Sequence, residues 1–574
     1  MKQAKKIINL ASFLLVSITS LSSTNLLAAT VKADMVIHNA KAYTVDGNGT
    51  VAQAIAVKGN KIIYVGSDVG VDKHIGRRTK LINAKKRLVL PGLHDVHTHP
   101  LEAGGQELSC LLTPTNTLTQ HVNTISACNA GSTGWILGWG YNVHTLVDAS
   151  NDPVSYLDQV SNTTPIAIMS ETSHSMWVNT AALNALGINA NTANPAGGVI
   201  VKNAAGQPSG LMFDTAGDMV LHQVLANPST ADKNSTYQGL LWALNQFKEN
   251  GVTSLGNARL YWKREYLDAW EKADYNYKLT ARAVMALWLY PEDVNDNAQI
   301  STLNSMYSND PNSFLRVSQI KMYSDGLPKN TTAALIDPYL HDAGIDIDSN
   351  NGLNYVNENR MAHFITELEK TGFDMLIHTI GDRGVRESLN AIETAQQING
   401  DIGRIRRHRL THVEYVNTND INRFNELDVI ADFQVAGDWT LPGNEDPLEL
   451  SLLGNARSSD HIPVRDIYNT GATITLSSDW DVSTNNPFVG MMNALQRDHQ
   501  SLPNIESAIE AYTINGAFTL GHENRVGSIE VGKLADFAIV NQDILTIPTD
   551  QIGSTKNLMT ILDGEVIYKN TRKW

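Results

Sequence analysis

The chain has 574 residues, of which 42% are hydrophobic and 18% are charged. This composition is typical of a globular protein with more than one domain, and it excludes an intrinsically disordered chain. The formal net charge of −15 argues against nucleic acid or an anionic membrane surface as the partner.

Residues 1–29 have the features of a secretory signal peptide. Three lysines within the first six residues precede an apolar run over residues 7–21, which is short for a membrane span. Small residues around Ala28 suit a signal peptidase, and no later segment is apolar enough to cross a bilayer. We therefore expect an exported protein, periplasmic or secreted, with no membrane partner after cleavage. A retained signal anchor is the alternative.

Strand-rich segments frame the two ends of the mature chain. The predicted strands cover residues 33–45, 54–66, 535–540, 559–562 and 565–568. Gly59-Asn60 and Asp563-Gly564 have the composition of tight hairpin turns. We expect one small β-sandwich built from both termini, over residues 30–90 and 525–574.

The only two cysteines, Cys110 and Cys128, are too few for a zinc site built from cysteine ligands alone. In an exported protein a disulfide between them would stabilise the fold by about 3 kcal/mol for a loop of this length. Two buried thiols are the alternative that the sequence leaves open.

Between the two ends, predicted strands and helices alternate, which indicates parallel strands with right-handed crossovers. The expected strands cover residues 93–97, 251–256, 280–289, 316–323, 373–378, 408–412, 429–434 and 472–479. Eight such strands predict an α/β fold, a (β/α)₈ TIM-like barrel over residues 91–524, with its active site at the carboxyl ends of the strands. The gap after the first strand is too long for one crossover and predicts an inserted subdomain over about residues 101–235.

His97 and His99 stand one residue apart at the end of the first predicted barrel strand. Alternate side chains of an extended segment point the same way, so both imidazoles can reach one metal ion. The pattern alone is weak, because a histidine is more often structural than a ligand. It gains weight from the other polar residues at predicted strand ends.

Four further residues end barrel strands on the same rim: Lys321, His378, His412 and Asp479. Lys321 and Asp479 belong to inward faces, because the residues that alternate with them are apolar. Each of the four has a structural alternative as a helix cap, an ion-pair partner or a hydrogen-bonded core histidine. Together with the histidine pair they favour a metal site, since the alternatives require several coincidences at one end of the barrel.

These motifs resemble the amidohydrolase superfamily, specifically its YtcJ-like branch, amidohydrolase family 3. The resemblance covers almost the whole mature chain, and its marks are residues 91–99, 251–254, 321–326, 378–383, 409–412, 478–479 and 527–536. It implies a barrel with one or two divalent metals, commonly zinc, that hydrolyses carbon-nitrogen bonds other than peptide bonds. Lys321 matches the position that binuclear members carboxylate to bridge both ions. The ligands implied by the resemblance are His97, His99, His378, His412 and Asp479.

The chemistry of such a reaction explains these residue types. Neutral imidazoles hold zinc and leave room for water, whose pKa the metal lowers to near 7. Asp479, the expected catalytic base, would take the proton of that water and pass it to the departing amine of a small-molecule substrate. Two alternatives remain: the same site acting on a lactone or a phosphoester, and a catalytically inactive barrel that binds a ligand.

Three residues are candidate substrate contacts. His174 lies in the Ser-His-Ser-Met-Trp motif of the predicted insertion, where it could form a pocket wall. Trp139 could stack on an aromatic ligand, although aromatic residues usually serve packing. Arg383 could hold an anionic group, with a surface or helix-dipole role as the alternative.

Overall fold

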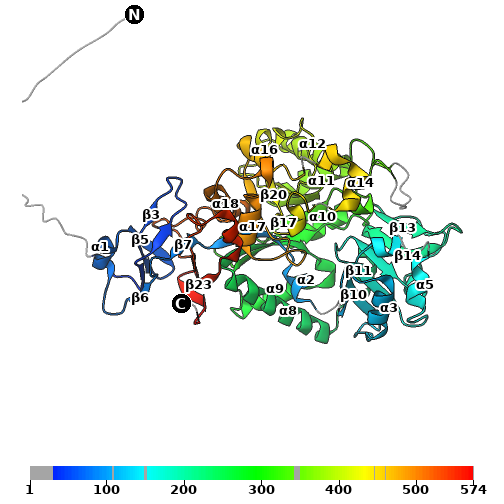
Figure 1. Ribbon diagram of the computed structural model, residues 1–574, viewed down its shortest axis with the longest axis horizontal. Helices are drawn as coiled ribbons and strands as arrows, with labels where there is room; N and C mark the ends of the chain where they lie inside the picture. The colour runs from blue at the N-terminus through cyan, green and yellow to red at the C-terminus, as the bar shows by residue number, and fades with distance from the viewer. Residues whose placement is uncertain are drawn as a thin grey trace, which may run out of the picture.

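The computed structural model describes residues 30–105, 109–147, 152–341, 350–444, 446–458, 461–572 and 574. The predicted signal segment, residues 1–29, lies outside the described residues. The described part forms three units in a row, with a β-sandwich at one end, a barrel in the middle and an inserted sheet at the other end (Figure 1). None of its helices has the length and apolar character that a membrane crossing requires.

Strands from both ends of the chain form the two sheets of the β-sandwich. The first sheet has the order β5 (Lys61–Gly66), β4 (Ala54–Lys58), β1 (Met35–His38) and β6 (Lys80–Asn83). The second has the order β24 (Glu565–Lys569), β23 (Asn557–Leu562), β22 (Phe537–Val540), β7 (Leu88–Pro91), β2 (Lys41–Tyr43) and β3 (Val51–Ala52). Apolar side chains such as Ile37, Ile55 and Phe537 pack in the shared core. The predicted strand over 33–45 is two strands in different sheets, because Asn39 turns the chain with a φ of 51°.

Eight parallel strands form the barrel sheet in chain order. They are β8 (Leu93–Thr98), β15 (Val252–Leu260), β16 (Arg282–Trp288), β17 (Leu315–Tyr323), β18 (Asp374–Thr379), β19 (Arg409–His412), β20 (Ile430–Phe433) and β21 (Ile474–Leu476). A parallel bridge between Thr98 and Trp480 brings the first strand to the segment after the last one. The predicted (β/α)₈ barrel is thus confirmed. The eighth strand ends at Leu476 instead of Asp479, since Asp479 has a φ of 51° and leaves the extended conformation.

Helices cover the outside of the barrel sheet. They are α8 (Thr230–Glu249), α9 (Tyr266–Tyr275), α10 (Asp296–Ser305), α11 (Glu358–Glu369), α12 (Asp382–Asn399), α13 (Arg423–Glu426), α16 (Val464–Asn469), α17 (Pro487–Ala494), α18 (Ile505–Ala511) and α19 (Ile514–Thr519). Helix α12 illustrates why these helices pack on the sheet. Its residues Val385, Leu389 and Ile392 recur at helical spacing and are buried, so one face of the helix is apolar.

The insertion after β8 is a second α/β unit with a six-stranded sheet. Its order is β13 (Gly198–Lys202), β14 (Pro208–Asp214), β12 (Ser175–Val178), β11 (Ile166–Ser170), β10 (Ile136–Tyr141) and β9 (Cys110–Leu111). Separate apolar clusters on its two sides include residues of α3 (Leu118–Ser126) and α5 (Pro153–Asp158) in one, and of α6 (Thr180–Leu186) and α7 (Thr215–Val224) in the other. Cys110 and Cys128 form a disulfide with a Cα–Cα distance of 5.7 Å, which decides between the two alternatives for the cysteines.

Candidate metal centre and active site

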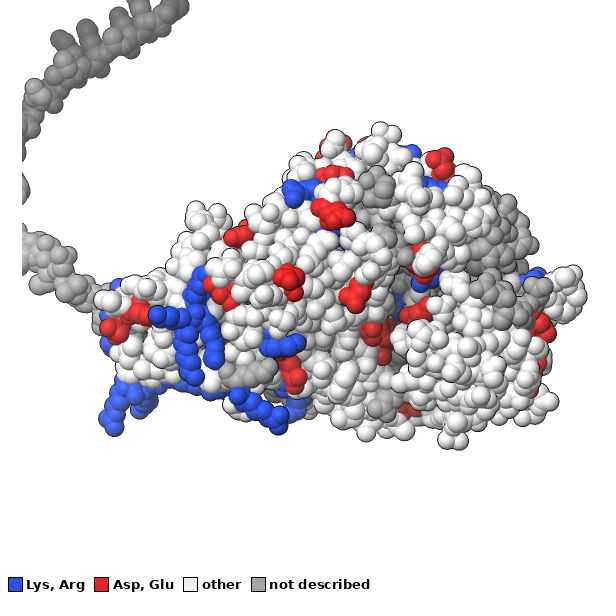
Figure 2. All heavy atoms as spheres, viewed as in Figure 1, with Lys and Arg blue, Asp and Glu red and all other residues white. Residues whose placement is uncertain are grey.

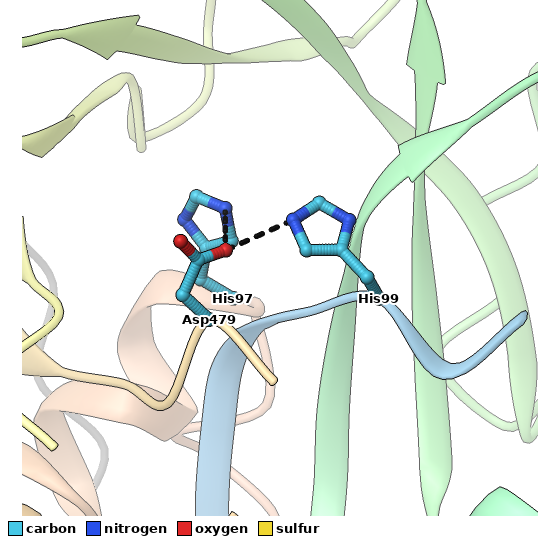
Figure 3. Close-up of side chains that lie close together, drawn as sticks. All are labelled: His97, His99 and Asp479. Carbon is cyan, nitrogen blue, oxygen red and sulfur yellow. Dashed lines mark hydrogen bonds and ion pairs between the residues drawn. The ribbon is translucent and has the colours of Figure 1, made fainter. Parts of the chain in front are cut away.

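Strand β8 carries the two neighbouring histidines to the mouth of the barrel. His97 lies in β8 and is fully buried, and His99 directly precedes α2 (Pro100–Gly104). Their Nε2 atoms lie 3.3 and 2.9 Å from Asp479 Oδ1, so one carboxylate oxygen faces both imidazoles (Figure 3). Ligand atoms of these three residues all lie within 4.8 Å of one another. A single metal ion with ligand distances of about 2.1 Å could bind all three after small side-chain movements.

Asp479 reaches this position through the closure of the barrel. Its backbone N–H donates to the carbonyl of His97 at 2.9 Å, and the N–H of Ser478 donates to the carboxylate of Asp95 at 3.0 Å. Burial would raise the pKa of Asp479, but the hydrogen bond with His99 and the electrostatic influence of the basic side chains around it lower that pKa overall. The side chain is therefore an anion at neutral pH, as a metal ligand or a general base requires.

Lys321, His378 and His412 lie beside this group of three. Lys321 Nζ is 3.3 Å from His97 Nε2. The ring centroid of His412 lies 5.2 Å from that of His97 and 4.5 Å from that of His378. All six predicted ligands therefore meet at the carboxyl end of the barrel, while their individual roles as ligands remain predictions.

The donor chemistry of this cluster fits a divalent metal. Both ring nitrogens of His378 are buried and have no hydrogen-bond partner among the residues that the structure describes. Burial lowers the pKa of His412 to about 4 and that of His97 well below the ordinary histidine value. Both imidazoles are therefore neutral at pH 7, which is the form that binds metal. Burial also lowers the pKa of Lys321 well below that of an exposed lysine.

Asp432 was not among the predicted residues, yet its carboxylate faces Nδ1 of His97, the ring nitrogen that points away from Asp479. It is fully buried in β20 and accepts hydrogen bonds from the hydroxyls of Thr475 and Ser477 at 2.8 and 2.9 Å. Asp432 Oδ2 lies 3.5 Å from His97 Nδ1, which also lies 2.6 Å from Thr411 Oγ1. A carboxylate on the far nitrogen of an imidazole orients the ring toward a metal. The signal in the sequence was a carboxylate inside an otherwise apolar strand.

The insertion brings His174 to the rim of the same site. His174 Nδ1 lies 2.8 Å from Asp214 Oδ1, which fixes the orientation of the ring. The ring centroid lies 5.6 Å from that of Tyr323, in a stacked arrangement, and 5.3 Å from that of His378. His174 therefore forms a wall next to the candidate ligands, and its contact with substrate remains a prediction. Asp214 follows 40 residues later in the chain, and no motif marked it.

A buried cation next to the cluster was also not predicted from the sequence. Arg259, near the end of β15, is 8% exposed, and its Nη1 donates to the hydroxyl of Tyr323 at 3.0 Å. Its Nε lies 3.9 Å from Glu102 Oε1 in α2. The ring of Tyr323 stacks on that of His378, with ring centroids 4.1 Å apart. Tyr323 therefore lies between Arg259 and the candidate ligand His378. The surroundings of His378 on this side are therefore polar.

The other two candidate substrate contacts have structural partners. Trp139 lies in β10 and packs against the apolar cluster of the insertion that contains Met169 and Met176. Arg383 lies in the first turn of α12, and its guanidinium donates to the carbonyl of Asn351 and to the carboxylate of Glu387. Among the described residues, no contact joins either side chain to the six candidate ligands. These contacts support the packing role for Trp139 and a structural role for Arg383 as a hydrogen-bond and ion-pair partner. The first turn of a helix is the unfavourable end of the dipole for a cation, so the helix-dipole role is not supported for Arg383. Substrate contact by either residue remains a prediction.

A parallel eight-stranded barrel with histidines, a lysine and an aspartate at its carboxyl end defines a metal-dependent hydrolase. The chain belongs to the amidohydrolase family, whose model matches residues 80–568. It is a metal-dependent hydrolase of that family.

Comparison with known proteins gives relatives of similar length. Protein LONG AFTER FAR-RED 3 of Arabidopsis thaliana is 25% identical, over 98% of this chain and 98% of its own. An N-substituted formamide deformylase of Arthrobacter pascens is 25% identical, over 94% of this chain and 99% of its own. The crystal structure of an uncharacterized metal-dependent hydrolase from Pyrococcus horikoshii OT3 covers 90% of this chain and 99% of its own, with a TM-score of 0.68 and 18% identity. At this identity the structural likeness shows the fold alone.

Proposed function

We propose that this protein is an exported, zinc-dependent hydrolase that cleaves an amide, formamide, urea or cyclic amide in a small molecule. The observation that carries the proposal is the convergence of His97, His99 and Asp479 within 4.8 Å at the barrel mouth. The name of the Arthrobacter relative, a formamide deformylase, supports a carbon-nitrogen bond as the target.

The residues of the site have distinct tasks in this reaction. His97, His99, His378 and His412 would hold the metal together with Asp479. When bound, the metal supplies Lewis-acid polarisation of a carbonyl group and makes water more acidic. Asp479 would accept the proton of the attacking water and return it to the nitrogen of the departing amine.

Lys321 completes the proposed site as a carbamate. Its Nζ is buried, lies 3.3 Å from His97 Nε2 and has no carboxylate within hydrogen-bond distance among the described residues. Addition of carbon dioxide to the neutral amine forms one N–C bond and releases one proton, which converts the side chain into an anion. An anionic arm at this position can bridge two cations, whereas an ammonium group would be repelled by them.

The identity of the metal as zinc and the export of the protein are the two remaining parts of the proposal. Imidazole nitrogens and carboxylate oxygens are the ligand types that zinc uses in catalytic sites. Export is supported by the apolar run over residues 7–21 and by the disulfide between Cys110 and Cys128, since disulfides persist in oxidising compartments.

A panel of substrates tests which bond is cleaved. The zinc-loaded protein should hydrolyse members of a set of N-substituted formamides, acyl amides, ureas and cyclic amides, with kcat/KM at least about tenfold above matched lactones and phosphotriesters, a difference of about 1.4 kcal/mol. Faster turnover of lactones or phosphotriesters would contradict the proposal, because fold and ligands alone do not fix the bond. No turnover of any class with metal bound would favour the inactive binding protein.

A further inference from the structure

The net charge of the chain conceals a strongly basic β-sandwich. Residues 31–90 contain eleven Lys and Arg and only four Asp and Glu, a net charge of +7 in a chain whose total is −15. Figure 2 shows Lys and Arg side chains gathered over the end of the molecule that Figure 1 assigns to the sandwich. The positive charge is therefore concentrated at one end, opposite the insertion.

The densest part of this charge follows one open edge of a sheet. Residues 77–87 contain six Lys and Arg and no Asp or Glu. Strand β6 lies in the middle of this segment and pairs with β1 alone, at the end of its sheet. We call five exposed residues of this segment the basic edge: Arg77, Arg78, Lys80, Lys85 and Lys86. In the part of the chain that the structure describes, none of the five forms an ion pair with an acidic side chain.

Protection of the strand edge accounts for only part of this pattern. A lysine on an edge strand prevents unwanted pairing with another chain, and Lys80 in β6 suits that purpose. The other four residues of the basic edge flank the strand and so extend the charge beyond the groups that could pair. Lys85 and Lys86 both adopt positive φ, of 55° and 61°, in the turn that leaves β6. The five residues of the basic edge thus form a ribbon of positive charge that, among the described residues, no acidic side chain neutralises.

We propose that the basic edge docks the protein on an anionic phospholipid surface. Clusters of four to eight Lys and Arg close to a bilayer surface attract acidic headgroups. Here the chain enters β1 at Met35, which is paired with Lys80, and the apolar run over residues 7–21 precedes it. Residues 22–34 span at most about 45 Å when extended, so until residues 1–29 are removed they keep the basic edge close to the membrane that receives the apolar run.

A flat surface suits this charge distribution better than a long soluble polyanion. The sandwich forms one end of the molecule, so docking there leaves the acidic remainder pointing away from the membrane (Figures 1 and 2). A flexible polyanion such as nucleic acid would also approach that acidic remainder and be repelled by it. This inference does not depend on the substrate, and it differs from the expectation that net charge alone gives for anionic membranes.

Vesicle sedimentation tests the proposal with protein that lacks residues 1–29 and retains every described residue. We expect sedimentation with vesicles of phosphatidylcholine and phosphatidylglycerol, and none with phosphatidylcholine alone. Binding should disappear at about 1 M salt, where the Debye length falls to about 3 Å. Equal binding to both kinds of vesicle, or to neither, would overturn the proposal.

Two variants with equal loss of charge locate the surface. The first removes four charges of the basic edge through Arg77→Gln, Arg78→Gln, Lys85→Gln and Lys86→Gln. The control removes four exposed lysines elsewhere through Lys202→Gln, Lys272→Gln, Lys278→Gln and Lys370→Gln. The first variant should bind anionic vesicles at least about a hundredfold more weakly, because four residues at about fivefold each multiply to about 600-fold. The control variant should bind much more strongly than the first variant.

Several results would contradict the proposal. Unchanged vesicle binding by the first variant together with increased light scattering would assign the basic edge to protection of the strand. Equal loss of binding in both variants would show that total charge is what matters. Binding to double-stranded DNA without binding to vesicles would assign the surface to a soluble polyanion.

Discussion

Asp479→Asn is expected to lower kcat by about 10² to 10⁴ while the fold survives. The neutral amide cannot take the proton of the attacking water, and it removes the anion that faces His97 and His99. The side chains are nearly the same size, so the closure of the barrel through the Asp479 backbone should be preserved. Turnover of a substrate identified by the panel and circular dichroism are the two measurements.

A buried carboxylate away from the barrel mouth provides the control. Asp420 is 2% exposed and pairs with Arg423 at 3.0 Å outside the site, so Asp420→Asn should keep most of the wild-type kcat. If Asp479→Asn also retained most of the rate, Asp479 would be neither the base nor an essential ligand. A loss of circular dichroism in that variant would point to a structural role instead.

If the site binds two metals, Lys321→Ala is expected to reduce metal content toward one equivalent and to lower activity by at least about tenfold, the scale on which loss of a supporting group affects metal sites. The substitution removes the proposed bridging anion and leaves the four histidines and Asp479 in place. A short carboxylic acid added to this variant should restore part of the rate, because it can supply the missing anion. Metal analysis and kinetics with and without the acid are the measurements.

A lysine of the sandwich serves as the control for this substitution. Lys41 in β2 pairs with Asp543, far from the barrel mouth in the fold, so Lys41→Ala should leave metal content and kcat unchanged. Two metals and normal activity in Lys321→Ala would refute the bridge. The site would then be mononuclear, with Lys321 in a structural or substrate-binding role.

The barrel could be predicted from sequence because its strands carry a local signal. In β17, Lys321 and Tyr323 alternate with Ile320 and Met322, and the strand is buried on both faces, as the parallel sheet of a barrel requires. The sandwich was harder to divide into sheets, since one turn residue, Asn39, sends two adjacent strands into different sheets. A continuous apolar segment does not reveal such a break.

Contacts between distant parts of the chain could not be predicted in the same way. His174 and Asp214 are 40 residues apart, and Arg259 and Tyr323 are 64 apart. Which polar groups meet depends on how the insertion and the strands pack, and no local pattern encodes it. The H-x-H pair was found because both of its residues lie on one strand end.

Charge was informative only when assigned to parts of the fold. The total of −15 predicted no affinity for anionic surfaces. That total combines a positive charge in residues 31–90 of the sandwich with a larger negative charge in the rest of the chain. The segment around β6 becomes a surface feature only once its strand is known to be an open edge. Local charge is the quantity that determines such contacts.

The amount of divalent metal bound to the purified protein tests the central claim most directly. Elemental analysis of protein prepared without chelator should give between one and two equivalents, because four histidines and Asp479 meet at one rim of the barrel. Removal of the metal should abolish turnover, and added zinc, manganese or cobalt should restore it. Well under half an equivalent, with no activity gained on adding any of these metals, would contradict the assignment of a metal-dependent hydrolase.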